Sequence, residues 1–224
     1  MLKKSMLLLP ILFSLCAFLP FKKKKVIFFG DSITQQGAQP GGYITRITDL
    51  CSKEKLAGQF DFIGKGVGGN KVYDLFLRFQ PDVLDQQPDI VLVYVGINDV
   101  WHKTSSGTGT DFDKFGKFYD AIITTLKQRG IQPVVCTPSV IGERNDFTNQ
   151  QDGDLNRYAS WIRRYAAENN VPLVDLRKIF LEYLQKNNPN NDEKGILTVD
   201  RVHLNEKGNQ LVAEEMWKVI KTLK

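Results

Sequence analysis

The stretch KVIFFGDSIT, Lys25–Thr34, changes character abruptly at its centre. Its first half is short, β-branched and aromatic, which is typical of a buried strand. The Gly, Asp and Ser that follow accept unusual backbone angles and are common where a strand gives way to a turn. The stretch therefore predicts a strand that presents Ser32 at the open end of a sheet. The alternative at this point is that Asp31 or Ser32 only caps a turn.

Strand-like and helix-like patterns alternate from this stretch to the end of the chain. The expected strands are KVIFF, FDFIG, DIVLVYV, IQPVVCT and VPLVDL. Helical periodicity covers residues 43–56, 72–84, 112–128 and 155–169, and two more helices are expected around Ile179 and Leu211. Strands separated by helices of this length predict an α/β fold with a parallel sheet covered on both faces. The continuous apolar run IVLVYV agrees, because a strand buried on both faces needs no alternation.

Two polar connections, residues 101–110 and 138–153, each follow a predicted strand. In an open parallel sheet they lie at the carboxyl edge of the strands, where ligands bind. Both connections are rich in Ser, Thr, Gly, Asn and Gln, and Trp101 is the one large aromatic residue near Asn98. This composition suits a polar alcohol better than a long lipid chain.

The chain of 224 residues, 42% of them hydrophobic, is long enough for one sizeable domain, expected over 22–224. Residues 1–21 differ: two lysines precede an apolar stretch, as in a secretory signal, so export is expected. A retained membrane anchor is the alternative, although Pro10 and Pro20 interrupt the stretch. Cys16 could indicate a lipid-modified N-terminus. The preceding Leu15, however, is bulky where lipid-modification signals have a small residue.

The charge and the sparse histidines and cysteines exclude several kinds of partner. A formal net charge of +5 is too small to indicate nucleic-acid binding, and membrane contact is expected only through an uncleaved N-terminal segment. Two distant histidines and scattered cysteines do not have the spacing of metal ligands, so no metal is expected. Cys51 and Cys136 could form one disulfide or remain as two buried thiols.

Four short stretches converge on the predicted carboxyl edge. Ser32 follows the first strand, GVGGN (66–70) the second and GIND (96–99) the third, and DRVH (200–203) precedes the last helix. In this order they resemble the SGNH hydrolases, also called the GDSL esterase and lipase family, whose sequence blocks carry Ser, Gly, Asn and His. The resemblance extends from about residue 25 to the end. It implies a three-layer α/β/α sandwich with a flavodoxin-like parallel sheet, and ester hydrolysis without a cofactor.

The resemblance also implies a role for each residue. Ser32 is expected to be the nucleophile, His203 its base, and Asp200 the carboxylate that holds the imidazole in one tautomer. Because Asp200 lies three positions before His203, one turn can bring both side chains to the same side. The backbone N–H groups of Ser32 and Gly69 and the side-chain amide of Asn98 are expected to form the oxyanion hole.

His102 is the only other histidine and lies four residues after Asn98, so it is an alternative base. Asp99 is the one acid at a suitable spacing to orient it. We expect instead that His102 lines the substrate entrance together with Trp101, Asp31 and Asp99.

Two rival functions come from other classes. The run GKGVGG (64–69) has the spacing of a dinucleotide fingerprint, but it follows the second strand, and the acidic residue expected at the end of the next strand is missing. A catalytically silent binding protein could use the same cleft, although it has no need for the whole set of family residues.

Two positions depart from the family pattern. Ile33 stands where Leu is usual, which is a conservative change in the core, and Gly64 stands where relatives often have Asn, which puts a supporting hydrogen bond in doubt. Neither is a predicted catalytic residue.

The sequence as a whole predicts an exported serine esterase that acts through an acyl-enzyme on acetyl or other short esters of a small-molecule or glycan alcohol. Lysophospholipid or thioester hydrolysis is the alternative.

Overall fold

The computed structural model describes residues 22–223, so the predicted N-terminal signal lies outside the described residues. The central sheet consists of β1 (Lys24–Gly30), β2 (Phe60–Gly66), β3 (Ile90–Tyr94), β4 (Gln132–Cys136) and β5 (Leu173–Val174). All strand pairs are parallel, and the strand order is β2-β1-β3-β4-β5. This is the flavodoxin-like order. The predicted fold class is therefore confirmed.

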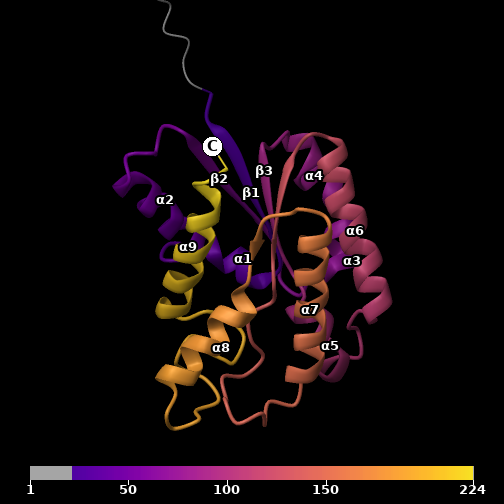
Figure 1. Cartoon of the computed structure of the whole chain (residues 1–224), viewed down its shortest axis with the longest axis vertical. Coiled ribbons are helices and arrows are strands. Elements are labelled where there is room, and N and C mark those ends of the chain that lie inside the picture. Colours follow the sequence, from indigo (N-terminus) through magenta and orange to yellow (C-terminus); the bar gives the residue numbers. More distant parts are fainter. Residues whose placement is uncertain (1–21, 224) are drawn as a thin grey trace, which may run out of the picture.

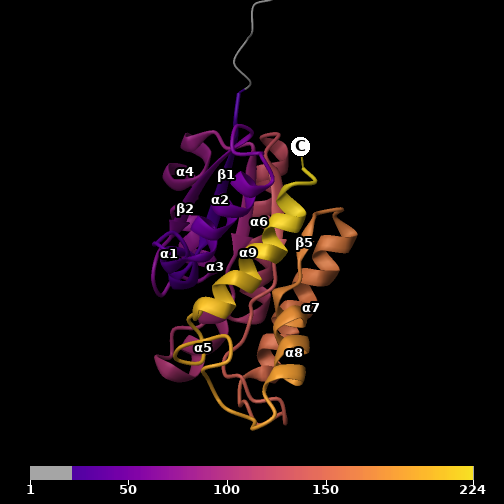
Figure 2. The ribbon, with the colours of Figure 1, turned by 90° about the vertical axis from the view of Figure 1, so that its left-hand side faces the viewer.

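Helices cover both faces of the sheet (Figure 1). They are α1 (Ser32–Gly37), α2 (Tyr43–Lys53), α3 (Val72–Leu77), α4 (Phe79–Asp82), α5 (Ile97–Ser105), α6 (Phe112–Gln128), α7 (Asp152–Glu168), α8 (Leu176–Asn187) and α9 (Glu206–Ile220). Helices α2 and α9 pack together on one face, as Figure 2 shows from the side. Helices α4, α6 and α7 lie across the other face.

The core follows directly from the apolar strands. Every residue of β3 is buried, and so are Val26–Phe29 of β1 and Pro133–Cys136 of β4. Helices on both faces therefore remove both sides of these strands from water, which accounts for their lack of alternation. Cys51 on α2 and Cys136 on β4 are buried and free, so the structure contains no disulfide between them.

The structure differs from the predicted elements in two places. The single helix expected over 72–84 is divided into α3 and α4, because Pro81 has no N–H to donate and its ring crowds the preceding turn. Residues 101–105, expected as part of a polar connection, continue helix α5. The Gln151 side chain donates to the carbonyl oxygens of Val100 and Trp101, so contacts from a distant loop hold a segment whose own composition favours a loop.

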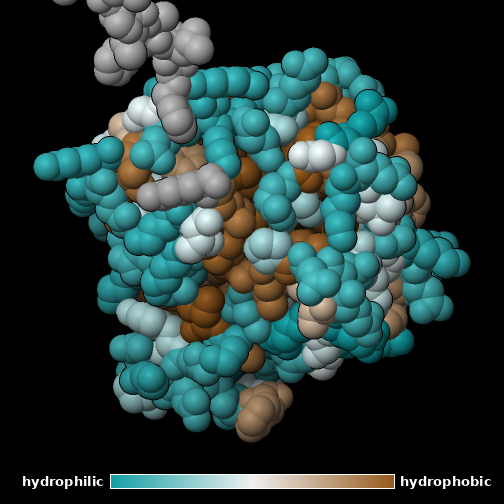
Figure 3. All heavy atoms as spheres, turned by 45° about the horizontal axis from the view of Figure 1, so that its top comes forward, coloured by the Kyte–Doolittle hydropathy of each residue, from teal (hydrophilic) through white to brown (hydrophobic). Residues whose placement is uncertain are grey.

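Hydrophilic side chains cover most of the face in Figure 3, with apolar atoms visible between them, as is usual for a folded domain. No helix within residues 22–223 has the length and apolar character needed to span a bilayer.

Candidate active site

Ser32 is the first residue of α1, directly after the buried strand β1. Asp31 caps this helix, and its side-chain Oδ1 accepts a hydrogen bond of 2.9 Å from the backbone N–H of Ile33. The cap fixes the turn between strand and helix, so Ser32 lies at the carboxyl edge of the sheet. The abrupt end of the apolar run is thus a strand-to-helix turn with a serine at its tip.

His203 lies between Ser32 and Asp200. Its Nε2 is 2.9 Å from Ser32 Oγ, and its Nδ1 is 2.6 Å from Asp200 Oδ2. The other carboxylate oxygen of Asp200 accepts hydrogen bonds from the backbone N–H groups of Val202 and His203. Although partial burial alone raises the pKa of Asp200, the hydrogen bonds from His203 lower it below the ordinary 3.8. The carboxylate therefore stays ionised at neutral pH beside the imidazole.

Three N–H donors lie in the elements around Ser32. Among the described residues, the backbone N–H groups of Ser32 and Gly69 have no hydrogen-bond acceptor. Asn98, near the start of α5, is buried, and its Nδ2 donates one hydrogen bond of 3.0 Å to the carbonyl oxygen of Asn70. An amide nitrogen carries two hydrogens, so one stays available for a ligand. Gly69 has φ of +76°, a conformation that favours glycine.

The second histidine is placed differently. His102 lies one turn after Asn98 on α5, beside Trp101, and both side chains are partly exposed. A Cβ added to Gly69 would lie 3.9 Å from His102 Cε1, so the imidazole borders the loop that carries Gly69. Burial, with the nearby charge of Lys71, lowers the pKa of His102. The geometry gives His203, and not His102, the contact with Ser32.

Asp31 and Asp99, expected to line the substrate entrance, are buried beneath it, 2% and 0% exposed. Burial raises the pKa of Asp31 to about 7, with a further contribution from the charge of Asp99, and burial raises the pKa of Asp99 to about 6. Asp99 Oδ1 accepts a hydrogen bond from the backbone N–H of Val72. The two buried carboxyl groups thus bind the first turns of α1 and α3, and Trp101 and His102 remain as candidate lining residues.

The raised pKa of Asp31 makes stability depend on pH. The folded chain binds a proton that the unfolded chain has already released, so the free energy of unfolding falls as pH rises from about 4 to 7. Asp31→Asn keeps the cap acceptor and removes the charge. Between pH 5 and pH 8 we expect the free energy of unfolding of the variant to rise relative to wild type by about 2 to 3 kcal/mol, measured by urea unfolding. An equal pH dependence in both proteins would contradict this account.

The residues that hold the Gly69 loop are not among those expected from the sequence. The Arg78 guanidinium donates to the carbonyl oxygens of Gly30 and Lys65 and to Asn70 Oδ1, so it ties the ends of β1 and β2 to this loop. Gln35 Oε1 accepts from the Gly68 N–H at 3.0 Å. In the sequence, Arg78 is one charged residue within an expected helix (72–84). A charged residue in such a position is typical of a solvated helix surface.

The glycines of the GKGVGG run have packing roles. A Cβ at Gly66 would lie 2.1 Å from the backbone nitrogen of Gln35, and one at Gly64 would lie 2.7 Å from Ala38 Cβ. These positions are filled by α1 and the turn after it, so they need glycine for close packing within the protein. The alternative of a dinucleotide fingerprint has no support from this arrangement.

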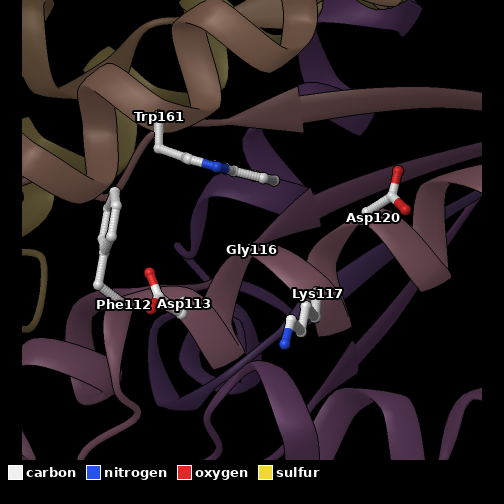
Figure 4. A pocket seen from close by; sticks show the side chains of 6 residues that line it. All are labelled: Phe112, Asp113, Gly116, Lys117, Asp120 and Trp161. Atoms are coloured by element: carbon white, nitrogen blue, oxygen red, sulfur yellow. The ribbon is translucent and has the colours of Figure 1, made fainter.

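A separate hollow of about 380 Å³ lies on the outside of α6 and α7 (Figure 4). It is lined by Phe112, Asp113, Gly116, Lys117, Asp120 and Trp161. Figure 4 shows the Trp161 ring above Gly116. The hollow contains none of the residues around Ser32 and is formed by helix surfaces, not by strand ends.

Comparison with known proteins agrees with this geometry. A model of the GDSL-like lipase/acylhydrolase family matches residues 28–211. An acetylxylan esterase of Geobacillus stearothermophilus is 29% identical over 208 residues, which cover 85% of this chain and 90% of that protein. An uncharacterized lipoprotein of Bacillus subtilis (strain 168) is 26% identical, covering 84% and 86%. A crystal structure of an acetyl xylan esterase, AlAXEase, superposes with a TM-score of 0.86 at 55% identity, covering 88% of this chain and 99% of that one.

Proposed function

This chain belongs to the GDSL-like lipase/acylhydrolase family and hydrolyses ester bonds, and on that premise we propose that Ser32, His203 and Asp200 are its catalytic residues. The observation that carries the proposal is the pair of contacts made by His203, 2.9 Å to Ser32 Oγ and 2.6 Å to Asp200 Oδ2. A serine hydroxyl is a weak nucleophile until an adjacent base takes its proton, and that base needs a fixed tautomer. The two contacts supply both conditions.

In the first step, His203 Nε2 takes the proton of Ser32 Oγ while Oγ forms a bond to the acyl carbon. The carbonyl oxygen becomes negative and accepts hydrogen bonds from the backbone N–H groups of Ser32 and Gly69 and from Asn98 Nδ2. When the tetrahedral intermediate collapses, the ester C–O bond breaks, and the alcohol leaves with the proton from His203. Asp200 keeps the other ring proton on Nδ1 throughout.

In the second step, water replaces the alcohol. His203 Nε2 takes a proton from the water while its oxygen attacks the acyl carbon, and a second tetrahedral intermediate forms. Collapse breaks the bond to Ser32 Oγ, which regains its proton, and the acid is released. The cycle needs no cofactor.

The substrate that fits best is an acetyl ester of a carbohydrate. Relatives that cover most of the chain act on acetylated xylan by name. Trp101 and His102 are partly exposed and lie next to each other on α5, and His102 borders the Gly69 loop. They are an aromatic and a polar group of the kind that contacts a sugar ring. We therefore propose an acetylated plant-type glycan, with acetate as the acid product.

Acetate release from acetylated xylooligosaccharides, measured beside hydrolysis of p-nitrophenyl acetate, butyrate, octanoate and palmitate, tests this substrate class. We expect the highest kcat/KM for acetyl groups and a loss of at least about tenfold for octanoate. A preference for octanoate or palmitate would instead indicate a lipase or lysophospholipase. Turnover of the p-nitrophenyl esters without acetate release from the glycan would agree with esterase activity. It would exclude acetylated xylooligosaccharides as the substrate.

Asn98→Ala tests the oxyanion hole. It removes one of three donors to the developing negative charge, so kcat is expected to fall about 10²- to 10³-fold with a small change in KM. The matched control is Asn169→Ala at the end of α7, whose side-chain amide donates to the carbonyl oxygen of Tyr165. Circular dichroism and the melting temperature establish that both variants are folded. Full activity in Asn98→Ala would remove this residue from the mechanism.

We further propose that the protein is exported. The support is the N-terminal pattern of two lysines and an apolar stretch, together with a relative that is named a lipoprotein. Fractionation of expressing cells, followed by N-terminal sequencing of the esterase, tests this. Recovery of the whole chain, Met1 included, from the cytosol would contradict it.

A further inference from the structure

The loop that carries Asp200 and His203 has little regular structure of its own. It connects the end of α8 to the start of α9. Its internal backbone contacts are a bridge between Thr198 and Leu204 and a few hydrogen bonds, one of them 2.8 Å from the Val199 N–H to the carbonyl oxygen of His203. A loop of this kind loses much conformational entropy when its side chains are held in one geometry. A contact from outside the loop would therefore restrict the position of His203 further.

Glu143, on the loop after β4, makes that contact. Its side chain is 0% exposed, and both carboxylate oxygens accept hydrogen bonds from three consecutive backbone N–H groups of the histidine loop. The distances are 2.7 Å from Ile196, 2.8 Å from Leu197 and 2.5 Å from Thr198. Within residues 22–223, no Lys or Arg forms an ion pair with Glu143. Backbone N–H groups are thus the partners of this buried carboxylate, and such charge-assisted bonds are strong.

The backbone beside Glu143 adds two further contacts to the same loop. The Gly142 N–H donates to the carbonyl oxygen of Arg201 at 2.9 Å, and the Glu143 N–H donates to the carbonyl oxygen of Glu193 at 2.9 Å. Arg201 has φ of +90°, which is unusual for a residue other than glycine and needs support from its surroundings. It lies between Asp200 and His203, so the contact with Gly142 holds the backbone at the turn that brings the acid and the imidazole together.

We propose that Glu143 is a positioning residue for His203. It acts through the backbone of Ile196–Thr198 and has no contact with Ser32, so it holds the distance between His203 Nε2 and Ser32 Oγ without taking part in the chemistry. The inference rests on the proposed function, because it assigns a catalytic consequence to the position of His203. A displacement of about 1 Å in such a geometry can cost about 100-fold in rate.

Glu143→Gln is the variant that tests this. It keeps the size of the side chain but replaces one acceptor oxygen by an N–H donor, which then faces a backbone N–H. We expect kcat for p-nitrophenyl acetate to fall about 10- to 100-fold while KM changes by less than about threefold. The proton NMR signal of the His203 Nδ1–H bonded to Asp200 is expected to broaden or disappear. If Glu143→Gln does not fold, Glu143→Asp replaces it. This side chain is one methylene shorter and still charged, and the same fall in kcat with little change in KM is expected.

The control for a general loss of stability is Leu126→Ala, a fully buried position on α6. It is expected to lower the melting temperature while kcat stays within about threefold of wild type and the NMR signal is retained. An unchanged kcat in a folded Glu143 variant would overturn the inference. So would a loss of kcat no larger than that of Leu126→Ala, since the effect would then be one of stability alone. Absence of esterase activity in wild type would contradict the proposed function itself, which is a different outcome.

Discussion

Ser32→Ala is expected to lower kcat for acetyl ester hydrolysis by about 10⁴- to 10⁶-fold. The reason is that alanine has no Oγ to attack the acyl carbon, so the acyl-enzyme cannot form. The side chain contributes one hydrogen bond to His203 Nε2, so the free energy of unfolding should change little. Hydrolysis of p-nitrophenyl acetate by wild type and variant, with unfolding followed by circular dichroism, measures both quantities.

Ser52→Ala is the matched control for that experiment. Ser52 is an exposed serine on α2 whose hydroxyl donates to the Thr48 carbonyl oxygen. It should retain the wild-type rate. If Ser32→Ala kept more than about a hundredth of the wild-type kcat, Ser32 would not be the nucleophile. A folded wild-type protein without turnover on any ester would instead favour the catalytically silent binding protein.

His203→Gln is expected to have an effect of similar size, about 10⁴- to 10⁶-fold in kcat, because the glutamine amide cannot take the serine proton. Serine and base act as a unit, so the double variant Ser32→Ala/His203→Gln should be little worse than either single variant. Steady-state rates on p-nitrophenyl acetate measure all three proteins under one set of conditions.

The chain offers its own control for the base. His102→Gln changes the only other histidine, which borders the Gly69 loop but has no contact with Ser32. Its kcat should stay within about tenfold of wild type, with any effect of substrate contact appearing in KM. Loss of activity in His102→Gln together with a fully active His203→Gln would reverse the two assignments.

Much of this arrangement could be predicted from sequence because it depends on local signals. Apolar runs identify the strands, and the carboxyl ends of parallel strands meet at one edge, so Ser32, Gly69 and Asn98 are expected together. The three-residue spacing of Asp200 and His203 predicts a shared turn, and the structure has the two side chains 2.6 Å apart. These predictions need no knowledge of distant contacts.

The parts that could not be predicted depend on contacts between segments far apart in the chain. Glu143 lies in a polar loop, where an acidic residue is usually solvated, and nothing in GER (142–144) indicates burial against the backbone of Ile196–Thr198. Helix α5 extends beyond the predicted loop boundary because Gln151 holds it from another loop. Asp31 and Asp99 are acidic, as residues that line a substrate entrance often are. Their burial depends on how the elements pack around the strand ends.

The measurement that tests the central claim most directly is covalent labelling by diethyl p-nitrophenyl phosphate. An activated serine attacks its phosphorus, the bond to the p-nitrophenyl oxygen breaks, and p-nitrophenol is released. The account predicts one diethylphosphoryl group per chain, located by mass spectrometry on the peptide that contains Ser32, with esterase activity lost in proportion to labelling. Labelling that spares Ser32, or full activity in the labelled protein, would contradict it.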